Sequence, residues 1–414
     1  MLAALLITAC RMHSPNAVSR QNLSSYYRTE EKMMRPKFSL FNVTDSMTRL
    51  YFTITSEELL YTKSGPADEF SAKILVSYSV HPVDFLKLIT DSGHVVMNDV
   101  AKSGEKKQLA AFVDMDIIGN GRYVVEVAVR DLNKMTISYA LLHLDHRGGN
   151  ARNNFIVTQP GTETPVFRND LDSGEAFSIR YYDPNITRLF VHYYVNRDGP
   201  APPPFAIYKN EPRPEADSSW WIDISSRQAI RFNRKGSYRF TTDSVTNGGF
   251  VLSCFYHGFP EITKAKELLY PLRYLVMKQE YTEMDTALNT KKAVDKFWLN
   301  ASGSEERARE LIRNYYNRVA AANTLFTTEK EGWKTDRGMI YLVFGPPQNV
   351  YRNSDSETWI YNNDMGPNGL GFVFDYNPEG WSDEEYVLSR NANYKVNWIQ
   401  AVDAWRQGHV YTLH

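Results

Sequence analysis

Residues 331–347, with the sequence EGWKTDRGMIYLVFGPP, decide how the last third of this 414-residue chain is organised. Residues 339–344 are apolar almost throughout and rich in β-formers, and Gly345-Pro346-Pro347 ends the run. A short apolar run bounded by Gly and Pro predicts a buried strand. Asp336-Arg337-Gly338 before it predicts a turn, because Asp bonds its own backbone and Gly tolerates positive φ.

The pentapeptide Gly332-Trp333-Lys334-Thr335-Asp336 matches the signature of the GWxTD domain family, which occurs in envelope proteins of the Bacteroidetes group of bacteria. The resemblance covers residues 290–414. It includes the run 339–344 with its Gly-Pro and the later segment 357–361, ETWIY. The family carries no established activity, so the resemblance implies membership and no particular reaction.

Two interpretations of the signature stay open, a turn that determines the fold or a recognition surface. We expect Asp336 to cap the turn, and Arg337 to pair with a carboxylate or with the face of Trp333 or Trp359. Thr335 is no candidate nucleophile, because the neighbouring residues offer no base. The signature residues are Gly332, Trp333, Thr335, Asp336, Arg337, Gly338, Gly345 and Pro346.

The N-terminus resembles the end of a bacterial lipoprotein signal. Residues 2–9 are apolar, and small residues precede the cysteine in Leu6-Ile7-Thr8-Ala9-Cys10. The resemblance implies removal of residues 1–9 and a lipid on Cys10. The alternatives are an ordinary hydrophobic start or a cleaved signal peptide with a coincidental cysteine. Residues 11–35 are polar and predict a tether or a loosely packed extension. Tyr26-Tyr27 and Met33-Met34 are its largest apolar groups, and we expect them to cover the edge of the first domain, with docking on a partner as the alternative.

The composition is that of a globular chain, with 43% hydrophobic and 23% charged residues. A net charge of −1 argues against a nucleic-acid-binding surface, which needs a basic excess. The 26 Tyr, 21 Phe and 8 Trp suit β-sheets and interaction surfaces. Cys254, the only other cysteine, lies in an apolar run and is predicted to be a buried free thiol.

The fold class that the sequence predicts is multidomain and β-rich: two Ig-like β-sandwiches followed by an α+β C-terminal domain. Short strands between Asp-, Gly-, Asn- and Ser-rich turns place the sandwiches at residues 36–147 and 155–260, with a Gly- and Asn-rich linker between them. A connecting segment, residues 261–289, leads to the domain of residues 290–414. There Ser302 or Ser304 is expected to cap a long helix that ends near Leu325.

Three further groups are candidates for chemistry. Trp220-Trp221 is either a sugar-stacking platform or part of a sandwich core. His143 and His146 resemble a metal pair, but a strand would place them on opposite faces. The consecutive carboxylates at residues 383–385 suit neither a glycosidase pair nor a calcium loop, and we expect a solvated helix start.

The sequence therefore predicts no catalytic residue, no metal site and no cofactor. We expect a non-enzymatic outer-membrane lipoprotein that acts as a binding or scaffold subunit of an assembly that builds or exports other proteins. Its partners would be the membrane, through the lipid, and other proteins, but not nucleic acid. The alternatives are a glycan-binding surface, a periplasmic lipoprotein, and a hydrolase with a deep pocket joining Asp336, Arg337 and distant acids. The side of the membrane stays open.

Overall fold

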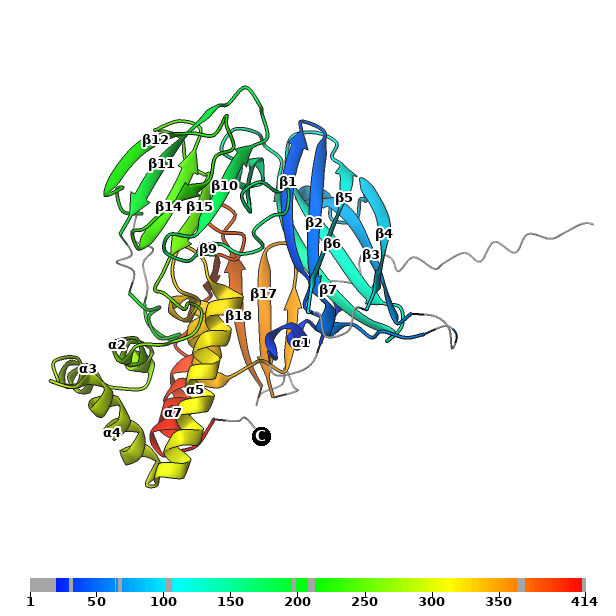
Figure 1. Cartoon of the computed structure of the whole chain (residues 1–414). Coiled ribbons are helices and arrows are strands. Elements are labelled where there is room, and N and C mark those ends of the chain that lie inside the picture. The colour runs from blue at the N-terminus through cyan, green and yellow to red at the C-terminus, as the bar shows by residue number, and fades with distance from the viewer. Residues whose placement is uncertain are drawn as a thin grey trace, which may run out of the picture.

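The structure is a computed structural model, and it describes residues 20–29, 33–63, 65, 69–101, 106–195, 199–207, 213–362 and 369–411. Figure 1 shows two β-sandwiches side by side at the top of the view and a mixed helical and β domain below them. The multidomain, β-rich fold class with an α+β C-terminal domain is therefore confirmed.

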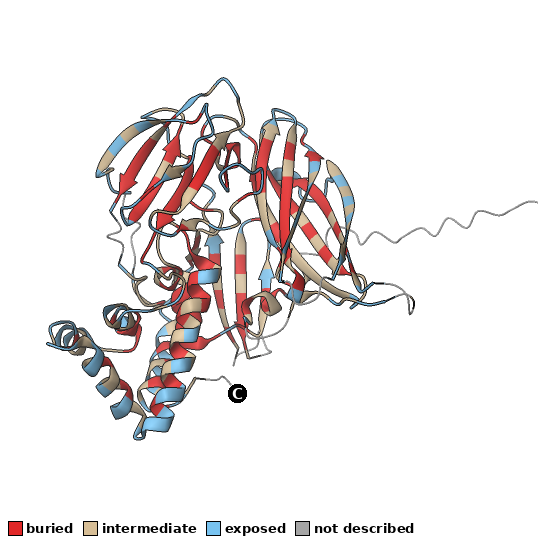
Figure 2. Ribbon diagram, in the orientation of Figure 1, coloured by how far each residue is buried: buried red, intermediate tan, exposed pale blue. Residues whose placement is uncertain are grey.

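In the first sandwich, a sheet of order β1-β2-β5 packs on a sheet of order β4-β3-β6-β7, and all strand pairs are antiparallel. Val125, Val127 and Val129 of β6 are fully buried, since alternate residues of a strand face the core. The resulting stripes are visible in Figure 2. The strands are β1 (Lys37–Thr44), β2 (Met47–Thr55), β3 (Ser71–Pro82), β4 (Asp91–Val100), β5 (Gln108–Asp116), β6 (Arg122–Asp131) and β7 (Thr136–Asp145).

In the second sandwich, a sheet of order β13-β10-β8 faces a sheet of order β12-β11-β14-β15-β9. Aromatic rings fill its core, and Cys254 is buried there as a free thiol, as the sequence predicts. The strands are β8 (Phe155–Thr158), β9 (Asp170–Leu171), β10 (Ala176–Tyr181), β11 (Arg188–Tyr194), β12 (Ser218–Asp223), β13 (Ile230–Arg231), β14 (Gly236–Thr241) and β15 (Phe250–Cys254).

The Gly- and Asn-rich stretch between the sandwiches is packed and does not form an extended linker. It contains the short helix η4 (Arg152–Asn154), and Asn153 and Asn154 are buried. The amide of Asn42 in β1 donates to Asn154 at 2.7 Å and to the carbonyl of Asp145 at 2.9 Å. These bonds hold the end of the first sandwich against the start of the second.

The C-terminal domain packs α5, α6 and α7 on an antiparallel sheet of order β16-β17-β18-β19. Ser304 caps the long helix α5, as predicted, whereas Asn289 caps α4. The elements are α2 (Ala265–Leu269), η5 (Tyr270–Tyr274), α3 (Lys278–Asp285), α4 (Thr290–Ser302), α5 (Glu305–Phe326), η6 (Gly332–Lys334), α6 (Asp336–Phe344), β16 (Asn349–Arg352), β17 (Ser356–Tyr361), β18 (Leu370–Tyr376), β19 (Tyr386–Leu388) and α7 (Tyr394–Arg406).

The predicted strand at residues 339–344 is wrong, because these residues form the last two turns of α6. All of them are buried, so the run shows no apolar stripe from which the helical period could be recognised. Thr335 caps the start of this helix, and Gly345 ends it at a φ of +87°. Local capping and tertiary burial together override the β-propensity of the run.

The prediction of a tether at residues 11–35 is wrong for residues 22–28. These residues, which include the short helix α1 (Ser24–Tyr27), pack against the C-terminal domain, 2% of Tyr27 remaining exposed. Tyr26-Tyr27 therefore does not cover the edge of the first domain, whereas Met34 packs on the first sandwich, as expected. The predicted cleavage site and Cys10 lie outside the described residues.

Candidate functional site

The two glycines of the signature bring three chain segments into direct backbone contact. A Cβ atom on Gly332 would lie 2.0 Å from the carbonyl oxygen of Ala322 in α5. A Cβ atom on Gly338 would lie 1.9 Å from the carbonyl oxygen of Gly332. No side chain fits at either position. The close packing of α5, η6 and α6 therefore requires glycine at both positions.

Thr335, and not Asp336, is the N-cap of α6. Its hydroxyl accepts a hydrogen bond from the Gly338 amide at 3.0 Å and donates to the Gly332 carbonyl at 2.7 Å. Asp336 occupies the first helical turn, where the helix dipole favours a carboxylate. The Asp336 carboxylate accepts from the Leu388 amide at 2.8 Å and pairs with Arg390, which ties α6 to β19 and the segment after it.

We expect Thr335→Ala to lower the free energy of unfolding by about 1 kcal/mol, the usual effect of removing a capping hydroxyl. Thr335→Ser keeps the hydroxyl and should stay close to wild type. Urea unfolding of the three proteins under the same conditions measures the difference. A Ser variant as unstable as the Ala variant would contradict the capping role.

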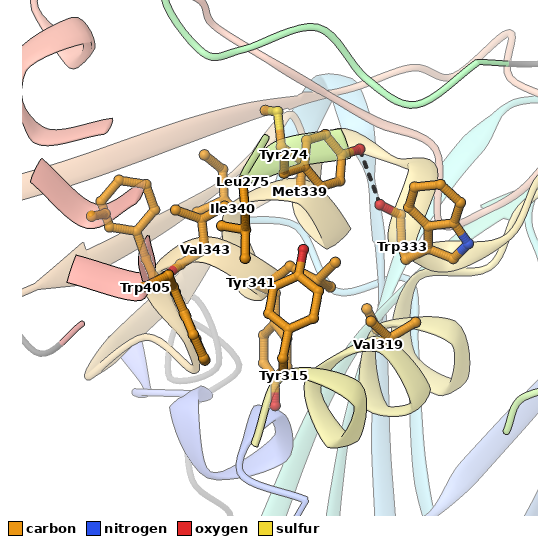
Figure 3. Packing of buried hydrophobic residues seen from close by; sticks show 14 of the residues in the cluster. Tyr274, Leu275, Tyr315, Val319, Trp333, Met339, Ile340, Tyr341, Val343 and Trp405 are labelled. Atoms are coloured by element: carbon orange, nitrogen blue, oxygen red, sulfur yellow. Dashed lines mark hydrogen bonds between the residues drawn. The ribbon is translucent and has the colours of Figure 1, made fainter. Parts of the chain in front are cut away.

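Trp333 belongs to the core of the C-terminal domain. Its carbonyl accepts a hydrogen bond from the Tyr274 hydroxyl at 3.1 Å, and its amide donates to the side chain of Asn323 at 3.2 Å. Figure 3 shows the first of these bonds beside the packed side chains of Val319 and Tyr315. The indole is buried. Trp333 thus offers no surface to a ligand in this conformation.

Arg337 is 1% exposed and lies between two carboxylates, Glu357 at 3.4 Å and Glu384 at 2.7 Å. The expected pairing with a carboxylate is confirmed. The aromatic faces under its guanidinium, however, belong to Phe326 and Tyr386, and not to Trp333 or Trp359. Burial alone would lower the pKa of Arg337, but the charges of Glu384 and Glu357 raise it above its ordinary value.

Glu357 is the centre of this buried charge cluster, whose members are Tyr27, Arg337, Arg352, Glu357 and Glu384. The Glu357 carboxylate receives hydrogen bonds from the Tyr27 hydroxyl at 2.8 Å, the Trp359 indole at 2.6 Å and the Arg352 guanidinium at 2.5 Å. Burial alone would raise its pKa, but Arg352 and Arg337 hold the pKa at about 2. The cluster joins the N-terminal segment to α6, β16, β17 and the turn before β19.

The low pKa of Glu357 predicts a loss of stability in acid. The ionised carboxylate contributes stability above its ordinary pKa of 4.5, and this contribution is lost as the pH falls toward 2. We expect the free energy of unfolding of the wild type to fall more steeply across this window than that of Glu357→Gln, which has no carboxylate to protonate there. Urea titrations at several pH values measure both slopes, and equal slopes would contradict the assignment.

Gly345 and Pro346 end the signature region. The backbone φ of +87° requires glycine at position 345. Beside it, Arg318 donates to the carbonyls of Leu342 and Val343. Carbonyls in the last turn of a helix have no partner within the helix, and the guanidinium takes that place here. Pro346 is exposed and stops the chain from continuing as helix. Among the signature residues that the sequence singled out, Pro346 is the one placed at the surface.

A pocket of about 480 Å³ lies where the two sandwiches and the C-terminal domain meet. Its lining includes His143, Arg147, Arg152 and Asp383, and both arginines pair with carboxylates of the lining, Arg147 with Asp145 and Arg152 with Asp383. Arg152 binds Asp383 at 2.7 Å, and His143 stacks on Tyr376 with ring centres 3.5 Å apart. Burial lowers the pKa of His143 to about 3, so this ring is neutral at pH 7.

This pocket is not the one that a hydrolase in the C-terminal domain would require. Neither Asp336 nor Arg337 lines it. The expected solvated helix start at residues 383–385 is also wrong, because Asp383 and Glu384 lie in a turn and Glu385 directly precedes β19. Asp383 pairs with Arg152 and Glu384 with Arg337, so two of these carboxylates hold neighbouring segments together.

Trp220 and Trp221 face opposite sides of β12. Trp220 packs on the core rings of Phe232 and Tyr238, whereas Trp221 is 44% exposed on the outer face of the sheet. The two indoles therefore do not form one platform. On the outer face, the Arg188 guanidinium lies 5.4 Å from the centre of a Trp221 ring, and Phe190 packs edge-on against it.

Within the ranges that the structure describes, no group of three or more His, Cys, Asp or Glu side chains is arranged to hold a metal ion. His143 and His146 lie at the end of β7 and just after it. No helix in the same ranges is long and apolar enough to cross a bilayer.

Sequence reasoning missed Tyr27, Arg352 and Glu384, which complete the charge cluster around Arg337 and Glu357. Tyr27 lies 330 residues before Glu357, so no local spacing connects them. One available signal is the pair Tyr26-Tyr27 inside an otherwise polar stretch. An arginine and a glutamate within strands of a buried sheet are a second signal of this kind, since buried charges need partners.

Comparison with protein families identifies the C-terminal part of the chain. The model of the GWxTD domain matches residues 236–407, so this part carries a GWxTD domain of about 170 residues. The match starts in β14 and thus reaches further toward the N-terminus than the resemblance over residues 290–414. A comparison with curated proteins found no match.

Solved structures with similar parts include glycoside hydrolases. One is β-glucuronidase 2 of Bacteroides uniformis, with 13% identity, a TM-score of 0.18, and coverage of 27% of this chain and 13% of that chain. Another is a glycosyl hydrolase family 2 member of Bacteroides cellulosilyticus, with 8% identity, a TM-score of 0.19, and coverage of 28% and 15%. The chain spans 15% or less of these enzymes, and a likeness this low carries no argument about activity.

Proposed function

We propose that this protein is a non-enzymatic lipoprotein of the outer membrane of a Bacteroidetes bacterium, and that it serves as a binding or scaffold subunit of an envelope assembly. The lipid on Cys10 would attach it to the membrane, and other envelope proteins would be its partners. The observation that carries the proposal is the packing of three modules into one body. Such a body presents surfaces on different modules in a fixed spatial relation.

The contacts between the second sandwich and the C-terminal domain support this rigidity. The Trp381 ring packs on Tyr194 at 4.7 Å and under the guanidinium of Arg213 at 4.8 Å. The hydroxyl of Ser237 donates to the carbonyl of Glu329 at 2.6 Å. Domains joined by few contacts move relative to one another, whereas buried aromatic and polar contacts of this kind hold them in place.

The signature supports a structural role within such a scaffold. Gly332, Thr335 and Gly338 determine how α6 packs, and Arg337 is enclosed by the charge cluster. The side chains of Thr335 and Arg337 are buried, so recognition of partners would fall to the outer faces of the sandwiches and helices. This arrangement favours the interpretation of the signature as a fold determinant over that of a recognition surface.

Affinity purification from detergent-solubilised membranes tests the proposal. We expect the tagged protein to be recovered with other envelope proteins, to lack residues 1–9 and to carry an acyl group on Cys10. Cys10→Ala should leave the membrane fraction, whereas the matched variant Cys254→Ala should remain in it. Recovery of the protein alone, or with residues 1–9 still attached and no lipid, would contradict the proposal.

A second candidate function, glycan binding, rests on the exposed ring of Trp221. An exposed indole flanked by Arg188, and by Asp223 at the end of the same strand, offers a stacking face and polar groups for sugar hydroxyls. Trp221→Ala should abolish binding to a glycan array if this surface binds sugars. Phe85→Ala removes another exposed aromatic ring, on the first sandwich, and is the matched control. If both variants bound glycans as the wild type does, Trp221 would be excluded as a sugar-binding residue.

A further inference from the structure

The N-terminal segment, residues 22–28, is bound along the edge of the C-terminal sheet. The Asn22 side chain donates to Asn349 at 2.8 Å and accepts from the Val350 amide at 2.9 Å. The Leu23 amide donates to the Val350 carbonyl at 2.8 Å. The amide and the carbonyl of Val350 are thus both hydrogen-bonded to the N-terminal segment. This segment covers the outer edge of β16, whose backbone groups would otherwise be open to pairing with another chain.

The same segment inserts a side chain into the domain core. The Tyr27 ring lies 5.7 Å from Phe326 and 5.3 Å from Trp359, centre to centre, and its hydroxyl donates to Glu357. The Tyr27 carbonyl accepts a hydrogen bond from the Tyr341 hydroxyl at 2.8 Å. The segment is therefore bound through backbone, ring and hydroxyl at once, although it lies outside the matched residues 236–407.

The chain is fixed again directly after this segment. Arg35 donates to the Arg28 carbonyl, and the Arg35 amide donates to Glu58 at 3.0 Å. Met34 is buried in the core of the first sandwich. Because residues 22–28 are held at both ends, the point from which the chain continues toward Cys10 has a fixed place on the body, beside β16.

Nine residues lie between Cys10 and Arg20, and the ten residue-to-residue steps from one to the other span at most ~33–36 Å whatever their conformation. A compact chain of this length has an expected radius of gyration of about 22 Å, which corresponds to a body roughly 55 Å across. A lipid on Cys10 would therefore hold one side of the body near the bilayer. In Figure 1, α1 lies in the lower half of the view, and β11 and β12 lie at the top.

We propose that residues 22–28 orient the protein on the membrane, with the β16 edge of the C-terminal domain toward the lipid and the far loops of the second sandwich away from it. This inference rests on the proposed lipid anchor. It names the surfaces that remain open to partners: the distal ends of the sandwiches, and not the side of the C-terminal domain that carries β16.

Depth-dependent fluorescence quenching tests this orientation. The lipidated full-length protein is reconstituted into phosphatidylethanolamine–phosphatidylglycerol vesicles that contain nitroxide-labelled lipid. One variant carries a fluorophore at Tyr351→Cys on β16, and the other at Gln228→Cys in the loop between β12 and β13; both positions are exposed. Cys254 is buried and should not react, which the unsubstituted protein checks.

We expect quenching at Tyr351→Cys to exceed that at Gln228→Cys at least about twofold, since the tether cannot reach across the body. Insertion of a 30-residue Gly-Ser segment between Ser14 and Pro15 extends the maximum reach to about 130 Å and should remove the difference without touching the fold. Equal quenching in vesicle-bound protein with the native tether would overturn the orientation and leave the anchor intact. Protein that stays unlipidated and free of vesicles would overturn the anchor, and the orientation with it.

Discussion

Tyr27→Ala should lower the free energy of unfolding of the C-terminal domain by about 3–5 kcal/mol, the range for truncation of a buried aromatic side chain. The substitution opens a cavity beside Phe326 and Trp359. It also removes a hydrogen-bond donor from Glu357, whose carboxylate is fully buried. Tyr27 lies more than 200 positions before the family match. A measured effect of this size would therefore show that the N-terminal segment completes the C-terminal domain.

A second variant of Tyr27 separates the contributions of the ring and the hydroxyl, and a variant of an exposed tyrosine serves as the control. Tyr27→Phe keeps the ring and leaves Glu357 one donor short, so a smaller loss of about 1–3 kcal/mol is expected. Tyr351→Ala removes an exposed tyrosine on β16 and should change stability by less than about 0.5 kcal/mol. Urea unfolding of the intact protein compares all three. A Tyr27→Ala protein as stable as Tyr351→Ala would show that the segment is not part of the domain.

The second large effect is expected for Gly338→Ala, which should prevent the C-terminal domain from folding or cost more than about 4 kcal/mol. Helix propensity alone favours Ala over Gly in a helix by about 1 kcal/mol, so the expected sign is the reverse of the local preference. The reason is the Gly332 carbonyl oxygen, 1.9 Å from the position of the new Cβ atom, with the Cα of Trp333 at 2.9 Å. Both neighbours are backbone atoms and cannot rotate away.

Gly371→Ala provides the matched control in the same domain. Its Cβ atom would meet the Trp359 carbonyl oxygen at 3.7 Å, an ordinary contact, and its φ lies outside the left-handed region. We expect this variant to fold and to unfold near the wild-type urea concentration. If Gly338→Ala behaved like Gly371→Ala in circular dichroism and urea unfolding, the close approach of η6 and α6 would be wrong.

The two sandwiches could be predicted because their strands carry a local signal. Alternation such as that of Val125, Val127 and Val129 marks the inward face of a strand, and turns rich in Gly, Asn and Asp separate one strand from the next. The cap at Ser304 carried an equally local signal, with acidic residues in the turn that follows.

The signature region could not be predicted, because what determines it is not local. Residues 339–344 have the composition of a strand, and only the cap at Thr335 and burial on every side make them helical. The carboxylates that pair with Arg337 lie 20 and 47 positions away. Trp220 and Trp221 do not share one surface, because neighbouring residues of a strand face opposite sides.

The role of the signature follows from these contacts. The glycines bring α5, η6 and α6 together, Thr335 starts the helix, and Arg337 pairs with Glu357, which accepts a hydrogen bond from the Tyr27 hydroxyl. The signature therefore builds the domain and holds the N-terminal segment in it.

Amide hydrogen exchange of residues 22–28 in the intact protein tests this binding most directly. The Leu23 amide, which donates to the Val350 carbonyl, should be protected and should exchange together with the amides of α6. Exchange of the Leu23 amide at the rate of an unstructured peptide, while α6 stays protected, would contradict the claim that the N-terminal segment is part of the C-terminal domain.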